Sequence, residues 1–249
     1  MEELVLYFSL KYEGDFQKIY NALLNKERVD ENLKKKLMKE VKCQYTTVFS
    51  DDYPIQLRHI NCPPFVLYYY GDLSLVNRSV LAVVGTHKPS AYGEEVTENF
   101  VKGLVKRNYT IVSGMARGIS GIAHQSAIDN GGKTIAVLGT GIDNCYPVCH
   151  KELYEELKNN HLLISEYPFQ TSPKKMSFPM RNRLVAGLSK GILVTEAKLN
   201  SKTMITVSYA LEQDKDVFAV PLRPSDYSGG NYLIQHGAFL VVKPEDITI

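Results

Sequence analysis

Short runs of β-branched and aliphatic residues recur from Val80 onward, and stretches with helix-like spacing of apolar residues separate them. The runs are VLAVVG, YTIVSG, KTIAVLG, HLLISEYP, GILVTEA, DVFAVP and AFLVVKP. Strands buried on both faces read as continuous apolar runs, and their alternation with helices is typical of βαβ units. The pattern predicts an α/β fold, an extended Rossmann-like, mostly parallel sheet with helices on both faces and right-handed crossovers.

Two segments precede these runs. Residues 1–44 scatter apolar positions among lysines and glutamates, which predicts a short helical N-terminal segment, a reduced accessory domain. Residues 51–71 carry prolines and a run of tyrosines and are expected to form an extended lead-in to the main domain of residues 45–249. The chain stops at Ile249, just after the last predicted strand, so no C-terminal winged helix is expected.

Composition restricts the class of protein. The chain of 249 residues is 44% hydrophobic and 22% charged with a net charge of +2, so any basic surface must be local. No apolar run approaches the roughly 20 residues of a membrane helix, and the start lacks a signal peptide. A cytoplasmic protein without membrane contact is expected. The four cysteines form no disulfide framework, and Cys145, Cys149 and His150 lack a second pair at zinc-finger spacing, so no metal is expected.

Ligands of an open parallel sheet bind at the carboxyl ends of its strands, so the loops found there are the candidate site. In the first loop Gly85 allows close backbone approach, and Lys88 adds charge. Thr86 and Ser90 carry hydroxyls that can donate to a phosphate. An ordinary βα turn with a serine near the helix start explains the same residues equally well.

The second loop, Ser113–Gly118, leads into a predicted helix. Ser113, Gly114 and Gly118 offer free N–H groups near the positive end of the helix dipole, which favours an anion. Arg117 adds a two-point phosphate donor, although a solvated arginine is the alternative.

The third loop begins as G-x-G at Gly139 and Gly141. Asn144 fills the third glycine position, so the loop fails the dinucleotide fingerprint. We expect a tight glycine turn near a ligand, and no cofactor.

Residues 173–190 form a basic run without an acidic residue. Arginine and aromatic side chains together supply what a single nucleic-acid strand needs, backbone charge and a stacking surface. Phe178 can stack a base, and a core position explains it equally well. The polar candidates in this run are Lys174, Lys175, Arg181, Asn182 and Arg183.

Glu166 and Glu196 each stand at a strand end, where a carboxylate could act as a general base. We favour the alternative, in which each pairs with Arg117, Arg181 or Arg183 and keeps the pocket rigid. His124 is interpreted as a packed or hydrogen-bonded helix histidine. No G-x-S-x-G nucleophile elbow is present, so no catalytic residue and no turnover are predicted.

Several motifs carry a family resemblance. SGMARGISGIAHQSAIDNGGKTIAVLGTGID, SEYP, FPMRNRLVAGLS, VTEA and GGNYLIQHGA occur in consistent order from about Ser50 to the end. This stretch resembles the DNA-processing protein A family, also called DprA or Smf. The resemblance implies a homodimer that binds single-stranded DNA and delivers it to RecA recombinase in natural transformation. It also implies a DNA-backbone pocket formed by the Ser113–Gly118 loop and the Arg181–Arg183 triplet.

The chain departs from the family pattern at several positions, including His87, Ser120 and Lys202. His87 replaces a usual arginine and is expected to be neutral at pH 7, which weakens one phosphate contact or moves it to Lys88. Ser120 replaces an aspartate, and Lys202 lies in a turn that is usually small. Two alternatives stay open, a nucleotide-processing hydrolase that uses Glu196 and a degenerate adaptor without DNA binding.

Overall fold

The structure is a computed structural model that describes residues 1–223 and 228–249. Its nine-stranded sheet has the order β1-β2-β6-β5-β4-β3-β7-β8-β9. All pairings are parallel except β1 with β2 and β2 with β6. The strands are β1 (Gln44–Thr47), β2 (Val66–Gly71), β3 (Val80–Val84), β4 (Thr110–Gly114), β5 (Thr134–Gly141), β6 (Leu162–Tyr167), β7 (Gly191–Val194), β8 (Asp216–Ala219) and β9 (Phe239–Leu240). All seven predicted strands are confirmed.

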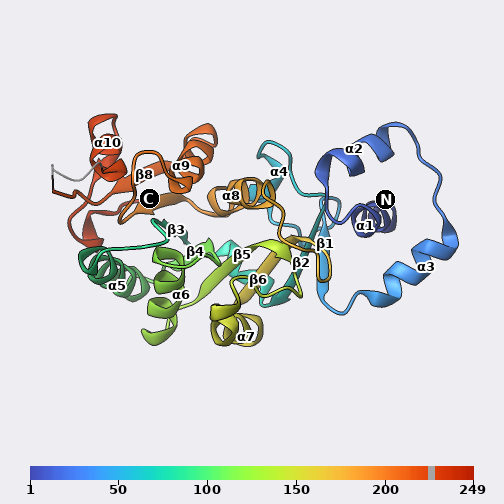
Figure 1. The fold of residues 1–249 in the computed structure, drawn as a ribbon, viewed down its shortest axis with the longest axis horizontal. Coiled ribbons are helices and arrows are strands. Elements are labelled where there is room, and N and C mark those ends of the chain that lie inside the picture. Colours follow the sequence, from blue (N-terminus) through green and yellow to red (C-terminus); the bar gives the residue numbers. More distant parts are fainter. Residues whose placement is uncertain (224–227) are drawn as a thin grey trace.

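Helices cover both faces of the sheet (Figure 1). Helices α4, α8, α9 and α10 pack on one face, and α5, α6 and α7 pack on the other. The helices are α1 (Glu2–Lys11), α2 (Phe16–Leu24), α3 (Glu31–Glu40), α4 (Ile55–Arg58), α5 (Ala91–Lys106), α6 (Ile119–Asp129), α7 (Lys151–Asn160), α8 (Ser177–Leu188), α9 (Lys202–Glu212) and α10 (Gly229–Gln235). The predicted Rossmann-like fold with a helical N-terminal segment is confirmed.

Strand β3 shows why the apolar runs identified the strands. Its five residues are all buried. Val80, Ala82 and Val84 face the core under α8 and α9, while Leu81 and Val83 face the core under α5 and α6. Because successive side chains of a strand point to opposite faces, a strand covered on both faces needs an apolar residue at every position.

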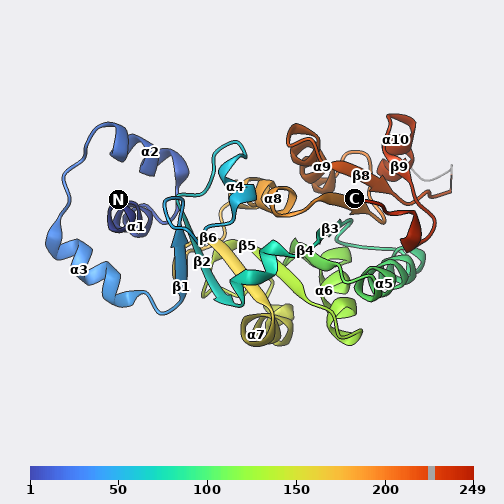
Figure 2. The same cartoon turned by 180° about the vertical axis from the view of Figure 1, so that it is seen from behind.

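The predicted lead-in forms more regular structure than expected. Its tyrosine run lies in β2, which pairs antiparallel with β6 and places Tyr69 opposite Ile164. Strand β1 then pairs with β2 and forms one edge of the sheet, beside the N-terminal helices (Figure 2). The pairing was not predictable from local pattern, because it joins residues about 95 positions apart in the chain.

The site is positioned by the strand order. From β3 the chain builds β4, β5 and β6 on one side and then returns to place β7 on the other. The loops that follow β3 and β7 therefore diverge, and in doubly wound sheets such a switch point opens a crevice at the carboxyl edge. Within the described residues no helix has the length and apolar character needed to cross a bilayer.

Candidate functional site

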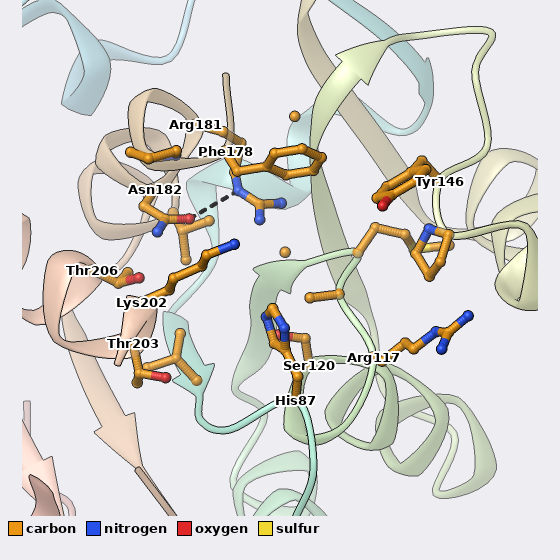
Figure 3. A pocket seen from close by; sticks show the side chains of 18 of the residues that line it. His87, Arg117, Ser120, Tyr146, Phe178, Arg181, Asn182, Lys202, Thr203 and Thr206 are labelled. Atoms are coloured by element: carbon orange, nitrogen blue, oxygen red, sulfur yellow. Dashed lines mark hydrogen bonds between the residues drawn. The ribbon is translucent and has the colours of Figure 1, made fainter. Parts of the chain in front are cut away.

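A pocket of about 580 Å³ lies at this switch point. Its walls come from the loops that follow β3 and β4, the segment before α7, one face of α8 and the first turns of α9 (Figure 3). Seven predicted site residues line it: Gly85, Gly114, Arg117, Gly139, Phe178, Arg181 and Asn182.

Arg181 is the most deeply buried cation of the pocket, with a side chain on α8 that is only 7% exposed. Its Nε donates to Asn182 Oδ1 at 3.1 Å, and Nη1 donates to the Val137 carbonyl. It forms no salt bridge with any carboxylate in the described part of the chain. Burial lowers the pKa of Arg181 to about 10, so the guanidinium stays charged at neutral pH. A buried charge without a counterion is costly, which gives the pocket a built-in preference for an anion.

Three more basic side chains surround the same space. Figure 3 shows the Lys202 ammonium directed toward the cavity and Arg117 at the rim on the opposite side. Burial, followed by the charges of Lys202 and Arg181, lowers the pKa of His87, so its ring is neutral at pH 7, as expected from the sequence. No aspartate or glutamate lines the pocket among the residues that the structure describes.

Two aromatic rings form the apolar part of the wall. Phe178 on α8 and Tyr146 before α7 lie with their ring centroids 5.6 Å apart at an angle of 47°. Phe178 is partly buried and Tyr146 is exposed. Tyr146 was not among the predicted site residues. Its signal, the Tyr-Pro pair after the third glycine loop, does not show by itself which helix the ring will face.

Gly114 and Gly139 pack against side chains of α8. A Cβ on Gly114 would lie 2.5 Å from Arg181 Cζ, and a Cβ on Gly139 would lie 2.7 Å from Phe178 Cδ1. Both glycines therefore make room for these side chains and fix where Arg181 and Phe178 sit. Both also line the pocket, and their contact with a DNA backbone stays a prediction.

The other glycines shape the loops. Gly118 has a φ of +70°, and a Cβ there would lie 2.6 Å from the carbonyl carbon of His87. The absence of a side chain at Gly118 therefore lets the loops after β3 and β4 pack closely. Gly85 packs against Ile119 in the same way. Gly141 lies outside the pocket, where its N–H donates to the Thr171 carbonyl at 2.8 Å.

The predicted hydroxyl donors are engaged in local structure. Ser90 caps α5 by accepting from the Gly93 N–H at 3.1 Å, which favours the ordinary-turn interpretation. Ser113 is buried and donates to the Val83 carbonyl at 2.6 Å. Thr86 Oγ1 accepts from the Lys88 N–H at 3.3 Å, and neither of these two residues lines the pocket.

Arg183 and the two carboxylates are also separate from the pocket. Arg183 is buried on another face of α8 and pairs with Glu166, so the prediction of an arginine partner is confirmed for Glu166. The same prediction is wrong for Glu196, whose carboxylate accepts from the Ser90 N–H and hydroxyl at 3.0 and 2.9 Å. Glu196 lies at the α5 N-terminus, where these donors replace an arginine.

The two lysines before α8 do not line the pocket either. Lys174 forms an exposed salt bridge with Glu13 of the N-terminal segment at 2.8 Å, and Lys175 is exposed. His124 is buried, as interpreted from the sequence. Its Nδ1 lies 2.7 Å from Thr134 Oγ1 and its Nε2 3.2 Å from the Gly114 carbonyl, beneath the second loop.

Known proteins share both the sequence and the fold. A family model described as DNA recombination-mediator protein A matches residues 44–249. The chain is 43% identical over 203 residues to DNA processing protein DprA of Streptococcus pneumoniae, which covers 81% of this chain and 72% of that protein. It is 41% identical over 203 residues to DNA processing protein DprA of Bacillus subtilis, covering 80% and 68%.

Two solved structures agree with these matches. An X-ray structure of DprA from S. pneumoniae matches with a TM-score of 0.83 and 36% identity, covering 99% of this chain and 92% of that one. A structure of DNA processing protein A from Helicobacter pylori, described in terms of its single-stranded DNA binding mode, matches with a TM-score of 0.75 and 31% identity, covering 82% and 94%. The chain belongs to the DNA recombination-mediator protein A family.

Proposed function

We propose that this protein binds single-stranded DNA in the switch-point pocket and delivers it to RecA recombinase, without catalytic turnover. The observation that carries the proposal is the buried, charged Arg181, which has no carboxylate partner in the described residues and opens onto a cavity that also receives Lys202. A phosphodiester group supplies the missing countercharge.

The aromatic wall favours a nucleic acid over a free anion. Phe178 and Tyr146 present ring surfaces beside the cationic part of the pocket. Bases stack on such rings with little sequence preference, and a cationic groove follows the backbone. The H. pylori relative, whose structure is described by its single-stranded DNA binding mode, supports the same ligand for this chain.

Binding without chemistry is supported by the positions of the carboxylates. A hydrolase needs a general base within hydrogen-bond reach of its substrate. Glu166 is held by Arg183, and Glu196 is held by Ser90. Neither lines the cavity, so among the described residues the hydrolase alternative has no aspartate or glutamate in position to act as the base.

A homodimer is proposed at the β9 edge of the sheet. Strand β9 has a neighbour on one side only, and Phe239, Leu240 and Val242 are exposed there. An open edge with exposed apolar side chains is suited to pairing with a second copy. Two pockets in one particle would add avidity to a site that makes few phosphate contacts. Delivery to RecA in natural transformation, within the cytoplasm, is proposed from the family resemblance.

The first test is fluorescence anisotropy with labelled oligo-dT across a salt series. We expect the logarithm of the binding constant to fall linearly with the logarithm of the salt concentration. We expect Arg181→Ala to abolish binding, while circular dichroism shows that the fold persists. Lys190→Ala is the matched control, because Lys190 directly precedes β7, at the amino ends of the parallel strands, and does not line the pocket. Absence of wild-type binding at low salt would overturn the proposal. RecA filament assembly on the same strands, measured with and without the protein, tests the delivery step.

A further inference from the structure

The first two turns of α9 face the pocket from the side opposite Arg117. Lys202, Thr203 and Thr206 all line the cavity. We infer that this end of α9 is a second phosphate subsite, in which Lys202 supplies the charge and Thr206 a hydrogen-bond donor. The inference rests on the proposed function and adds to it a phosphate contact separate from that of Arg181.

The Thr206 hydroxyl is the independent sign of a ligand. Its side chain is only 4% exposed, lines the pocket and has no hydrogen-bond partner in the described part of the chain. A hydroxyl within a helix commonly donates to the carbonyl four residues earlier, as Ser208 does to Met204 at 3.1 Å. Figure 3 shows the Thr206 oxygen on the side of the cavity. The oxygen is not among the fully buried atoms that lack a partner, so it is accessible from the cavity, where a phosphate oxygen would accept from it.

The start of the helix is also open. Ser201 is the N-cap residue, yet it makes no side-chain cap hydrogen bond, and its buried Oγ has no partner in the described residues. No acidic residue lies in the first turn. The Met204 N–H donates to the Ser201 carbonyl at 3.1 Å, but the positive end of this 11-residue helix has no side-chain acceptor within the described residues, which is an arrangement that favours phosphate groups.

Lys202 and Arg181 act on the same space from different walls. Both charges lower the pKa of His87, which lines the same cavity. Lys202 is exposed and forms no ion pair in the described residues, so its ammonium is available to follow a ligand, while Arg181 is fixed by Asn182 and Val137. A fixed guanidinium and a movable ammonium suit two different phosphates of one flexible strand.

The test compares Lys202→Ala, Thr206→Val and the control Lys190→Ala by oligo-dT anisotropy across salt. Lys202→Ala is expected to weaken binding about 5- to 10-fold and to make the slope of log K against log salt shallower by about 0.7, one phosphate contact fewer. Thr206→Val, which keeps the shape of the side chain, is expected to weaken binding about 2- to 5-fold with no change in slope, because no charge is lost.

The outcomes separate the two proposals. If wild-type protein does not bind oligo-dT, the proposed function fails. If wild type binds and Arg181→Ala does not, while both α9 variants match Lys190→Ala, the α9 subsite is refuted and the proposed function stands. Melting temperatures of all variants are measured first. Should Thr206→Val be destabilised, the slope change of the exposed Lys202→Ala variant decides alone.

Discussion

Arg183 and Glu166 form a buried two-point ion pair, with Nη1–Oε2 at 3.0 Å and Nη2–Oε1 at 2.7 Å. Arg181, two positions earlier on α8, has no such partner in the described residues. Residues two apart on a helix differ by about 200° in direction, so the two arginines of the RNR triplet occupy different environments. Glu166 neutralises Arg183 inside the protein, whereas the Arg181 charge faces the pocket.

Removing one partner of the buried pair is expected to destabilise the fold. Glu166→Ala leaves the Arg183 charge buried, and the free energy of unfolding should fall by about 3–5 kcal/mol in urea denaturation. The double variant Glu166→Leu/Arg183→Met should recover most of that loss. Glu13→Ala breaks only the exposed pair with Lys174 and should cost less than about 1 kcal/mol. Equal losses from both pairs would contradict this assignment.

Arg181→Met is expected to separate stability from binding. The variant removes a desolvated charge, so the free energy of unfolding should stay unchanged or rise by about 1 kcal/mol. Oligo-dT binding should fall at least about 10-fold, since the pocket loses its fixed cation. Urea denaturation and anisotropy on the same preparation measure both quantities. A variant that binds normally would show that Arg181 is only a structural residue.

Gly114→Ala is expected to weaken binding through Arg181. The new methyl group would contact the guanidinium and displace it, and affinity for oligo-dT should fall about 10-fold. Gly103→Ala is the matched control, because its Cβ would lie 2.5 Å from Pro244 Cβ, far from the pocket in the contact between α5 and the C-terminal segment. Both variants should lose about 1–3 kcal/mol of stability, but only the first should lose binding.

Acid is expected to destabilise the domain through His124. Burial lowers the pKa of His124 to about 3, against an ordinary value of 6.5. Between these values the unfolded chain binds a proton that the native state excludes, so stability falls as the pH drops from about 6.5 toward 3. Urea midpoints at pH 7 and pH 4.5 measure the effect. His124→Gln should reduce the dependence, while His87, whose pKa is also lowered by burial, keeps part of it.

The parallel strands were predictable because a strand that is covered on both faces has apolar residues at successive positions of its sequence. Within α8 the signal was also local: Phe178, Arg181, Asn182 and Val185 all line the pocket at helical spacing, which excludes Arg183 from the same face. This spacing is readable in the sequence itself. Tyr146 and Thr206 could not be assigned to the pocket, since the strand order brings their segments to one cavity across large sequence separations.

The pocket is assembled from segments that span residues 84 to 206 and converge only when the strand order is complete. A partly folded chain or a fragment therefore holds no site, and ligand binds to the native state alone. Bound ligand therefore raises the free energy of unfolding, by about 2.7 kcal/mol when the free ligand concentration is 100 times the dissociation constant. Under the proposed function, bound DNA would also protect the protein against proteolysis.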